Sequence, residues 1–386
     1  MISEKVFETY KGNQKIKGKI FSDGKSDVKL PVMIASHGFG CDCTEMESYC
    51  KYFSERGYLC LSYNFCGGGG RGELQSDGES TEMNVFTEIE DLLAVIEYVK
   101  GLECADTDNI TLLGFSQGGF VSGLTASRLN EKIANLVMIC PAICIPDHAR
   151  LGMLGGAKYD LDNIPESWTC PNGMVIGRQF HEAVKDMDPY LELAKFKGKV
   201  LLIAGEKDPV VNYSYQVKAY QCYEEGQCEF LMIRDGGHGF GADVMPNILV
   251  DIESFLQGKK NIMSVNVFCT KVEEFDKTDD MHRIGVFFTG YSDGDDFRGI
   301  ILPGACDTQT KIGDGDYKLC ADYTLSGVDK EKQECIIHVI NKQAEDGYFR
   351  PTIDSDSKYI RNLIKGKDIV AALEFFDGGL TVRLWG

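Results

Sequence analysis

The sequence predicts an α/β domain over residues 1–258, carrying an insertion at about 142–190, and an all-β domain over residues 261–386. Three observations predict this arrangement. Short apolar segments alternate with helical segments in the first part. Prolines and aromatic residues break that alternation inside the insertion, which is too long for an ordinary connection and is expected to act as a lid. Beyond residue 258 only short strand-like segments follow, separated by turns rich in Gly and Asp.

The strands expected in the first domain are short, apolar and bounded by Gly, Pro or Asp, as is typical of strands buried in a parallel sheet. They lie at 32–36, 58–64, 110–114, 136–140, 200–204 and 229–233. Apolar residues at helical spacing predict helices at 44–56, 84–100, 117–130, 211–225 and 242–257. Strands that alternate with helices predict a mostly parallel sheet covered on both sides, and residues 5–30 are expected to form a hairpin on its antiparallel edge.

The second domain is expected to be an antiparallel barrel or sandwich, because its strand-like segments are short and closely spaced. They lie at 284–289, 299–302, 335–339 and 380–384. The sequence Gly-Lys-Lys-Asn at 258–261 is the expected junction with the first domain. Four charged residues of the second domain face either its interior or solvent, and solvent is favoured: Arg298, Asp307, Asp322 and Arg350.

Composition excludes several classes of partner. A net charge of −19 and a pI near 4.8 argue against binding to nucleic acid or to an anionic membrane surface. No apolar run reaches the roughly 18 residues of a membrane span, and the N-terminus lacks the features of a secretory signal. The 15 cysteines are an odd number and are scattered, which favours reduced thiols in a cytoplasm. Cys41-x-Cys43 has no second pair to complete a metal site, so neither metal nor cofactor is expected.

The first indication of a catalytic site is the segment Gly-Phe-Ser-Gln-Gly-Gly at 114–119. The G-x-S-x-G pattern alone is weak evidence in a chain with 43 glycines. Here it follows the strand at 109–113 and opens the helix at 117–130, which is the context of a nucleophile elbow. Such a turn lifts the serine above the sheet, and the flanking glycines allow strand and helix to approach closely. Ser116 is therefore the expected nucleophile.

A serine hydroxyl needs a base within hydrogen-bond distance. Of six histidines, His238 lies between the last strand and the last helix of the first domain, in a Gly-rich loop that leaves its ring free to reach the serine. The others are expected elsewhere: His282 and His338 in the β domain, His148 and His181 in the insertion, and His37 in a loop after the first buried strand. His238 is the expected base.

The carboxylate that orients the base should follow the strand between the serine and the histidine in the chain. Asp208 lies just beyond the strand at 200–204 and precedes Pro209, which fixes the turn toward the next helix. Glu206 is the alternative, and Asp208 is favoured. Its expected role is to hold the imidazole tautomer and to stabilise the imidazolium.

Two N–H groups should stabilise the oxyanion of the tetrahedral intermediate. Gln117 follows the nucleophile directly, and Phe39 lies in the His-Gly-Phe-Gly loop at 37–40. The backbone N–H groups of these two residues are the expected donors. The glycine run at 66–72 lacks the Lys-Ser/Thr ending of a P-loop and is expected to be a loop beside the site.

With these residues in place, residues 1–258 resemble the bacterial feruloyl (cinnamoyl) esterases of the α/β-hydrolase superfamily. The matching segments are His-Gly-Phe-Gly at 37–40, Tyr-Asn-Phe at 63–65, Glu-Ile-Glu-Asp-Leu at 88–92, Ser-Gln-Gly-Gly at 116–119, Pro-Ala at 141–142, Asn-Ile-Pro at 163–165 and the loops of Asp208 and His238. The resemblance implies an α/β-hydrolase fold with a lid at 142–190 that forms a phenol pocket. The family uses the matching positions as nucleophile, acid, base and oxyanion donors.

The resemblance also implies candidate substrate contacts. Related enzymes bind the ring hydroxyl through an Asp and a Gln of the lid. Asp147 aligns near that Asp, His148 competes for the position, and Gly155 stands at the place of the Gln. His37, at the start of the oxyanion loop, is a further candidate contact.

Residues 275–386 resemble a small bacterial β-domain family of unknown function, which implies a closed antiparallel barrel. The matching segments are Phe-Arg-Gly-Ile-Ile-Leu-Pro-Gly at 297–304, Ala-Asp-Tyr-Thr-Leu at 321–325, Tyr-Phe-Arg-Pro at 348–351 and Leu-Thr-Val-Arg-Leu-Trp at 380–385. We expect this domain either to cover the active site or to mediate self-association into a homo-oligomer.

The sequence thus predicts a serine carboxylesterase that releases hydroxycinnamic acids from small soluble esters by way of an acyl-enzyme. Two alternatives within the same fold are a broad short-chain acyl esterase and an aminoacyl peptidase. An alternative of another class is a ligand- or partner-binding protein with a degenerate hydrolase domain. The complete triad with both oxyanion positions favours the enzyme.

Overall fold

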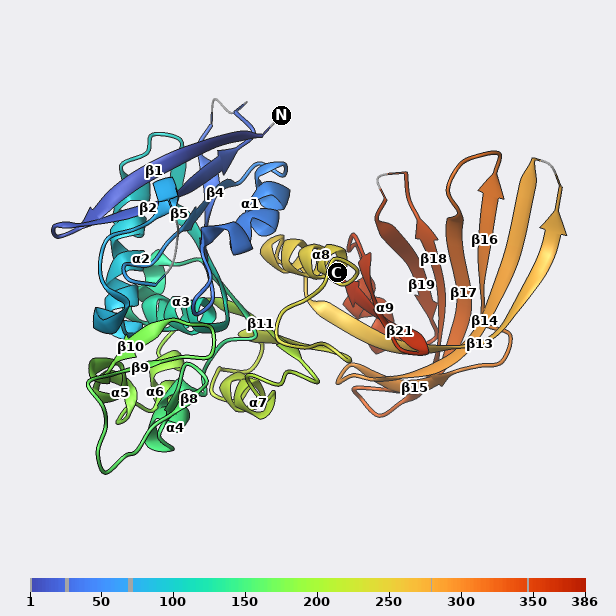
Figure 1. Ribbon diagram of the computed structural model, residues 1–386. Helices are drawn as coiled ribbons and strands as arrows, with labels where there is room; N and C mark the ends of the chain where they lie inside the picture. The colour runs from blue at the N-terminus through green and yellow to red at the C-terminus, as the bar shows by residue number, and fades with distance from the viewer. Residues whose placement is uncertain (1, 25–27, 69–71, 279, 346) are drawn as a thin grey trace. The chain divides into compact units, whose positions relative to one another are not determined.

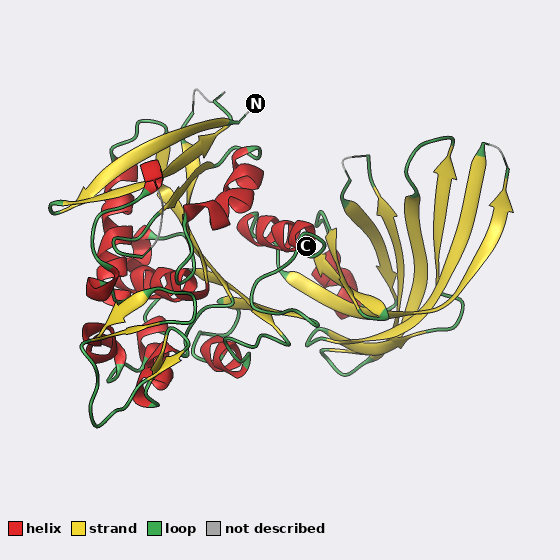
Figure 2. Cartoon of the chain, viewed as in Figure 1, coloured by secondary structure: helices red, strands yellow, loops and turns green. Residues whose placement is uncertain are grey.

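The computed structural model describes residues 2–24, 28–68, 72–278, 280–345 and 347–386 (Figure 1). Its internal contacts divide the chain into two compact units, residues 1–239 and residues 240–386. The first unit combines strands and helices, and the second consists mainly of strands, as Figure 2 shows. Residues 69–71 of the glycine run lie outside the described residues.

The first unit is built on one mixed sheet of eight strands. In spatial order they are β1 (Ser3–Lys11), β2 (Gln14–Ser22), β4 (Leu59–Tyr63), β3 (Leu30–Ser36), β5 (Ala105–Phe115), β6 (Asn135–Ile139), β11 (Lys199–Gly205) and β12 (Cys228–Ile233). The strands from β4 to β12 pair in parallel, and the β1–β2 hairpin adds two antiparallel strands at one edge. The predicted strands and edge hairpin are confirmed, with ends shifted by a few residues.

Seven α-helices belong to the described part of this unit. They are α1 (Glu47–Ser54), α2 (Val85–Lys100), α3 (Ser116–Leu129), α4 (Ile145–Arg150), α5 (Arg178–Val184), α6 (Pro189–Leu193) and α7 (Ser214–Tyr220). α2 begins at a capping box, in which the Asn84 side chain accepts from backbone N–H groups while Thr87 reaches back. Its buried face includes an acidic residue, Glu88, between Val85 and Leu92. Burial of a carboxylate at a core position indicates a specific partner.

The insertion consists of small elements rather than one long helix. It contains α4, α5 and the hairpins formed by β7 (Met153–Leu154) with β8 (Ala157–Lys158) and by β9 (Ser167–Thr169) with β10 (Val175–Gly177). The Tyr159 and Trp168 rings are tilted by 33° with centroids 4.3 Å apart, and the Tyr159 hydroxyl meets the His181 ring at 2.8 Å. Both rings pack against the hydrophobic core of the unit.

The second unit is an antiparallel sheet that closes on itself. In spatial order its strands are β13 (Asn261–Lys277), β21 (Gly379–Trp385), β20 (Val370–Phe376), β19 (Phe349–Ser355), β18 (Glu334–Gln343), β17 (Lys318–Asp329), β15 (Phe297–Ile301), β14 (Met281–Asp293) and β16 (Cys306–Ile312). β13 pairs with β21 on one side and with β14 on the other, which closes the barrel. β15 and β16 both pair with β14 and β17, at different points along them. The seam between β19 and β20 has a single residue pair.

Alternation of side chains explains the interior of this barrel. In β18, the residues Cys335, Ile337, Val339 and Asn341 are buried while those between them are more exposed. Asp307 points into the interior with them, whereas Arg298, Asp322 and Arg350 are exposed. The expectation of a solvated position therefore holds for three of these four charged residues and is wrong for Asp307. Successive side chains of a strand point alternately to the inside and the outside of the barrel, so a shift of one position is enough to turn a charged residue inward.

Two helices belong to the described part of the second unit, α8 (Met245–Leu256) and α9 (Lys358–Ile364). α8 is the helix expected at 242–257, and it packs against β20 and β21. Asp251 of α8 is fully buried and holds the Arg383 side chain of β21. α9 has no counterpart among the predicted elements, because seven residues give too short a pattern for helical spacing to show.

The structure agrees with the expectation of reduced cysteines, since all 15 are free thiols. Within the described residues, no helix combines the length and the apolar character that a membrane crossing requires.

Candidate active site

Ser116 occupies a tight turn between β5 and α3. Its φ of 53° lies in the left-handed region, which costs a non-glycine residue on the order of 1–3 kcal/mol and points to a functional constraint. The glycines on either side have no room for a Cβ atom. At Gly118 such an atom would lie 2.3 Å from the Ser36 carbonyl oxygen, and at Gly114 it would lie 2.3 Å from the Gly118 oxygen. Close packing of β3, β5 and α3 thus holds the serine in its strained conformation.

His238 links Ser116 to Asp208. Its Nε2 atom lies 2.9 Å from Ser116 Oγ, and its Nδ1 atom lies 2.8 Å from Asp208 Oδ2. The imidazole is 16% exposed, whereas the Asp208 side chain is 1% exposed. The carboxylate is therefore shielded from solvent, whereas part of the imidazole is accessible. This chain of contacts lets the imidazole take the proton of the hydroxyl as that oxygen attacks.

Asp208 is fixed by its own turn. Its Oδ1 atom accepts hydrogen bonds from the backbone N–H groups of Val210 and Val211, at 2.8 and 2.9 Å. Burial alone would raise the pKa of Asp208, but the hydrogen bonds from His238 and from these backbone groups outweigh it and lower that pKa. The carboxylate is thus ionised at neutral pH. Glu206 is exposed and accepts instead from the backbone N–H of Asp235, at 3.0 Å.

The two expected oxyanion donors are the backbone N–H groups of Gln117, which directly follows Ser116, and of Phe39, which comes much earlier in the chain. Gln117 is in the first turn of α3, where a backbone N–H has no carbonyl partner within the helix. The loop carrying Phe39 passes close by, since a Cβ atom built on Gly38 would lie 3.3 Å from Ser116 Cβ. That loop is held by Glu45, whose carboxylate accepts from the Gly38 N–H at 2.8 Å.

The side chain of Gln117 contacts a buried carboxylate, that of Glu88. The side-chain Nε2 atom of Gln117 lies 2.8 Å from both carboxylate oxygens of Glu88 in α2. Burial raises the pKa of Glu88 to about 8, although the hydrogen bond from Gln117 opposes the shift. Sequence reasoning does not predict this contact, and its one signal is an acidic residue, Glu88, on the apolar face of α2.

Cys140 and Phe115 also lie beside the imidazole. The Phe115 ring is 5.1 Å from the His238 ring, and the Cys140, Asp208 and His238 side chains offer ligand atoms within 4.8 Å of one another. Burial raises the pKa of the Cys140 thiol to about 12, so it stays protonated, whereas metal binding needs a thiolate. Both nitrogens of His238 already have partners in Ser116 and Asp208. This group therefore fits hydrogen bonding better than metal binding.

Of the proposed substrate contacts, His37 has the clearest position. It is 1% exposed, with Nδ1 2.8 Å from the Gly38 carbonyl oxygen and Nε2 3.4 Å from the Phe65 backbone N–H. Its ring meets the Phe65 ring edge-on, at a centroid distance of 4.9 Å. Because both nitrogens face backbone groups, the geometry gives His37 the role of shaping the oxyanion loop and does not support contact with substrate.

The lid candidates lie on α4 and are not linked to the triad by the hydrogen bonds of the described residues. Asp147 pairs with Arg150 on the same helix, and His148 meets the Tyr215 ring edge-on at 6.4 Å. Gly155 lies closer to the oxyanion loop. A Cβ atom there would be 2.4 Å from Cys170 Sγ and 3.1 Å from the Phe39 ring. This position therefore has no room for the Gln side chain of related enzymes.

Comparison with known proteins agrees with this architecture. The family model of the serine aminopeptidases S33 matches residues 29–159, a range that includes Ser116 but ends before Asp208 and His238. The chain is 30% identical over 96 residues to an uncharacterised 31.7 kDa protein of Escherichia coli from the traX-finO intergenic region. That match covers 25% of this chain and 32% of the relative. The chain therefore spans about a third of the length of the curated relative it matches.

Among solved structures, Est1E from Butyrivibrio proteoclasticus with ferulic acid bound is similar at a TM-score of 0.60 and 24% identity. The match covers 65% of this chain and 98% of Est1E. The first unit has the α/β-hydrolase fold. The Pyrococcus furiosus esterase Pf2001 is also similar, with a TM-score of 0.50, 21% identity, and coverage of 67% of this chain and 93% of the esterase. The α/β-hydrolase fold expected from the motifs is thereby confirmed, and the barrel follows it as a separate unit.

Proposed function

We propose that the protein is a serine carboxylesterase that hydrolyses hydroxycinnamate esters of the feruloyl, caffeoyl or coumaroyl type. The observation that carries this proposal is the unbroken series of contacts from Ser116 through His238 to Asp208, at 2.9 and 2.8 Å. A nucleophile, a base and an orienting acid in this geometry support acyl transfer.

In the proposed reaction, Ser116 Oγ attacks the ester carbonyl carbon while His238 Nε2 takes its proton. The backbone N–H groups of Gln117 and Phe39 stabilise the oxyanion, and Asp208 stabilises the imidazolium. Collapse of the tetrahedral intermediate expels the alcohol, which leaves with the proton from His238. Water then attacks the acyl-enzyme with His238 as base, and the carboxylic acid is released as Ser116 regains its proton.

The choice of acyl group rests on two supports. Est1E, similar in fold, is described with ferulic acid bound. The insertion of this chain carries two aromatic rings in contact, Tyr159 and Trp168, of a kind that packs well against planar rings. We infer that the ester lies between the insertion and the oxyanion loop, and that its alcohol part is small and soluble, such as quinate or a sugar.

Rates on a panel of esters test the proposal. Purified protein would be assayed with methyl ferulate, methyl caffeate, methyl p-coumarate and p-nitrophenyl acetate. We expect kcat/KM to be highest for the hydroxycinnamates and Ser116→Ala to abolish turnover of all four. Higher kcat/KM for the acetate would show a broad short-chain esterase instead, and turnover that survives in Ser116→Ala would exclude the assigned nucleophile.

An aminoacyl peptidase is the second candidate, because the S33 serine aminopeptidase model matches residues 29–159. An amide leaving group needs protonation as it departs, which His238 could supply. Aminoacyl p-nitroanilides separate the two candidates: efficient cleavage of an anilide with slow cleavage of methyl ferulate would favour the peptidase. Absence of turnover on all substrates would favour a binding protein with a degenerate hydrolase domain.

A further inference from the structure

The barrel of the second unit encloses a cavity of about 170 Å³. Its walls are formed by residues spaced two apart on six strands, such as Val267 and Cys269 in β13 or Leu319 and Ala321 in β17. The remaining lining residues come from the strands around it: Val286, Phe288, Asp307, Gln309, Tyr323, Asn341, Phe349, Leu373, Phe375, Leu380 and Val382. The side chains on this face of the sheet thus leave a space that they do not fill.

Three oxygen atoms at this mainly apolar cavity have no hydrogen-bond partner among the described residues. They are Asp307 Oδ1, Tyr323 Oη and Asn341 Oδ1. Tyr323 is 3% exposed and Asn341 is 4% exposed. A buried polar atom without a partner costs about 1–3 kcal/mol, so three at one cavity indicate a bound molecule that pairs with them.

The chemistry of these atoms limits what that molecule can be. Asp307 Oδ2 accepts from the Gln309 side chain at 2.8 Å, which leaves Oδ1 as an acceptor without a partner among the described residues. Burial raises the pKa of Asp307, opposed by the hydrogen bonds from Gln309 and from the backbone of Cys320. Lys, Arg and His are absent from the described lining residues. A carboxylate or phosphate ligand would have no cation to pair with here.

Size and polarity together point to one class of ligand. An apolar cavity of about 150 Å³ is enough to bind benzene. We propose that the barrel binds a small uncharged aromatic alcohol of the phenol type, with its ring against the apolar wall and its hydroxyl accepting from Tyr323 Oη and donating to Asp307 Oδ1 or Asn341 Oδ1. The Tyr323 ring already lies edge-on to the Phe288 ring at 5.6 Å, which provides an aromatic wall for such a ligand. This site is independent of the proposed esterase activity.

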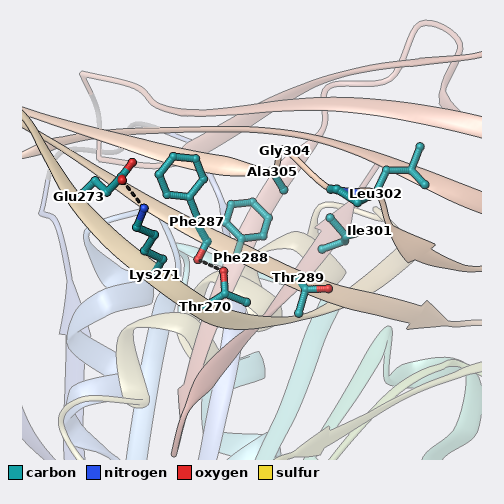
Figure 3. Close-up of a pocket in the computed structure, with 11 residues that line it drawn as sticks. Thr270, Lys271, Glu273, Phe287, Phe288, Thr289, Ile301, Leu302, Gly304 and Ala305 are labelled. Atoms are coloured by element: carbon teal, nitrogen blue, oxygen red, sulfur yellow. Dashed lines mark hydrogen bonds and ion pairs between the residues drawn. The ribbon is translucent and has the colours of Figure 1, made fainter.

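An open groove adjoins the cavity. It has a volume of about 570 Å³ and is lined by Thr270, Lys271, Glu273, Phe287, Phe288, Thr289 and residues 301–305 (Figure 3). Figure 3 shows the Phe287 and Phe288 side chains at this groove, with Lys271 directed to Glu273. Because Phe288 lines both spaces, the groove is the expected way in, and Phe288 separates it from the cavity.

Binding of p-cresol (4-methylphenol) to the full chain tests the proposal, measured by isothermal titration calorimetry. Toluene and p-toluate serve as matched probes that lack the hydroxyl or replace it with a carboxylate. We expect p-cresol to bind at least tenfold more tightly than either. Tyr323→Phe should weaken p-cresol binding about three- to tenfold and leave toluene binding unchanged, because it removes one hydroxyl and keeps the ring.

Two further variants locate the site. Ala321→Phe fills the cavity and should abolish p-cresol binding, with folding checked by circular dichroism. Tyr317→Phe is the matched control, since the Tyr317 hydroxyl meets the His282 ring and is not part of the cavity lining. Failure of p-cresol to bind, equal binding of p-toluate, or an affinity for p-cresol that Tyr323→Phe and Ala321→Phe leave unchanged would overturn the proposal.

Discussion

The amide of Gln117 and the carboxylate of Glu88 form a buried contact, in which one nitrogen lies 2.8 Å from both carboxylate oxygens. Gln117 directly follows the proposed nucleophile, and Glu88 belongs to the face of α2 that packs in the core. The contact therefore ties the first turn of α3, which carries an expected oxyanion donor, to the neighbouring helix.

Replacement of Glu88 by Gln should change how stability depends on pH. The pKa of Glu88 is raised from 4.5 to about 8, so the folded protein holds a proton there that the unfolded chain releases. That contribution to stability is fully present below pH 4.5 and is lost as pH rises through about 8. We expect the free energy of unfolding of Glu88→Gln to fall less than that of the wild type between pH 5 and pH 8, in urea titrations at both values. Glu90→Gln, on the same helix but exposed, should keep the wild-type dependence, and identical behaviour of all three proteins would contradict the assignment.

Asp208→Asn tests which acidic residue orients the base. The amide cannot hold the imidazole in the tautomer that accepts the serine proton, so kcat should fall on the order of 10⁴-fold. Glu206→Gln is the matched control, because Glu206 Oε2 accepts from the Asp235 N–H and an amide oxygen can do the same. We expect Glu206→Gln to retain kcat within about threefold. Steady-state rates on methyl ferulate measure both, and a larger loss in Glu206→Gln would reverse the two roles.

Gly155 offers a test of the contact between the insertion and the oxyanion loop. In Gly155→Ala the new methyl group would collide with Cys170 Sγ and approach the Phe39 ring at 3.1 Å, at a φ of +58°. Gly173→Ala has a similar φ of +85° but meets no atom within 4 Å. Backbone strain alone should cost the control about 1 kcal/mol.

We expect Gly155→Ala to lose more stability than Gly173→Ala and also to lower kcat/KM, because displacement of Phe39 moves its N–H from the oxyanion. Thermal unfolding and ester hydrolysis measure the two effects. Equal behaviour of the two variants would show that the collision is relieved without moving the loop.

The contact between Arg383 and Asp251 is the main polar feature of the second unit. The Arg383 guanidinium donates to both oxygens of Asp251 at 2.7 to 3.1 Å and also pairs with Glu374, and all three residues are buried. Trp385 adds a hydrogen bond to Asp251, at 2.7 Å. Arg383 thereby joins α8 to β20 and β21.

Arg383→Leu should destabilise the second unit by about 3–5 kcal/mol, because it leaves two buried carboxylates without their cation. Arg298→Leu breaks the exposed ion pair with Asp295 in the same unit and should cost less than about 1 kcal/mol. Urea unfolding of both variants in a Trp168→Phe background, in which Trp385 is the only tryptophan, reports the difference. A loss as small as that of Arg298→Leu would mean that water or other groups replace the guanidinium.

Most of the first unit could be predicted from the sequence because its signals are local. Strands buried on both faces show as apolar runs, and Ser116 stands between a strand and a helix within a few residues. The chain order of Ser116, Asp208 and His238 also appears directly in the sequence. The specific ester cannot be derived in this way, since it depends on how the insertion packs over the site. Asp147, His148 and Gly155 show this: the resemblance places them at lid positions, but only the fold shows that Gly155 has no room for a longer side chain.

What the sequence by itself determined is the alternation of strands and helices, the nucleophile elbow and the all-β character of the second part. Only the tertiary structure decided that Asp208 rather than Glu206 meets His238, that Glu88 supports Gln117, and that Asp307 faces the inside of the barrel. The physical reason is that hydrogen-bond partners and unfilled space arise between elements distant in the chain. Periodicity indicates which face of a strand is buried, but it does not show which buried atoms are left without a partner.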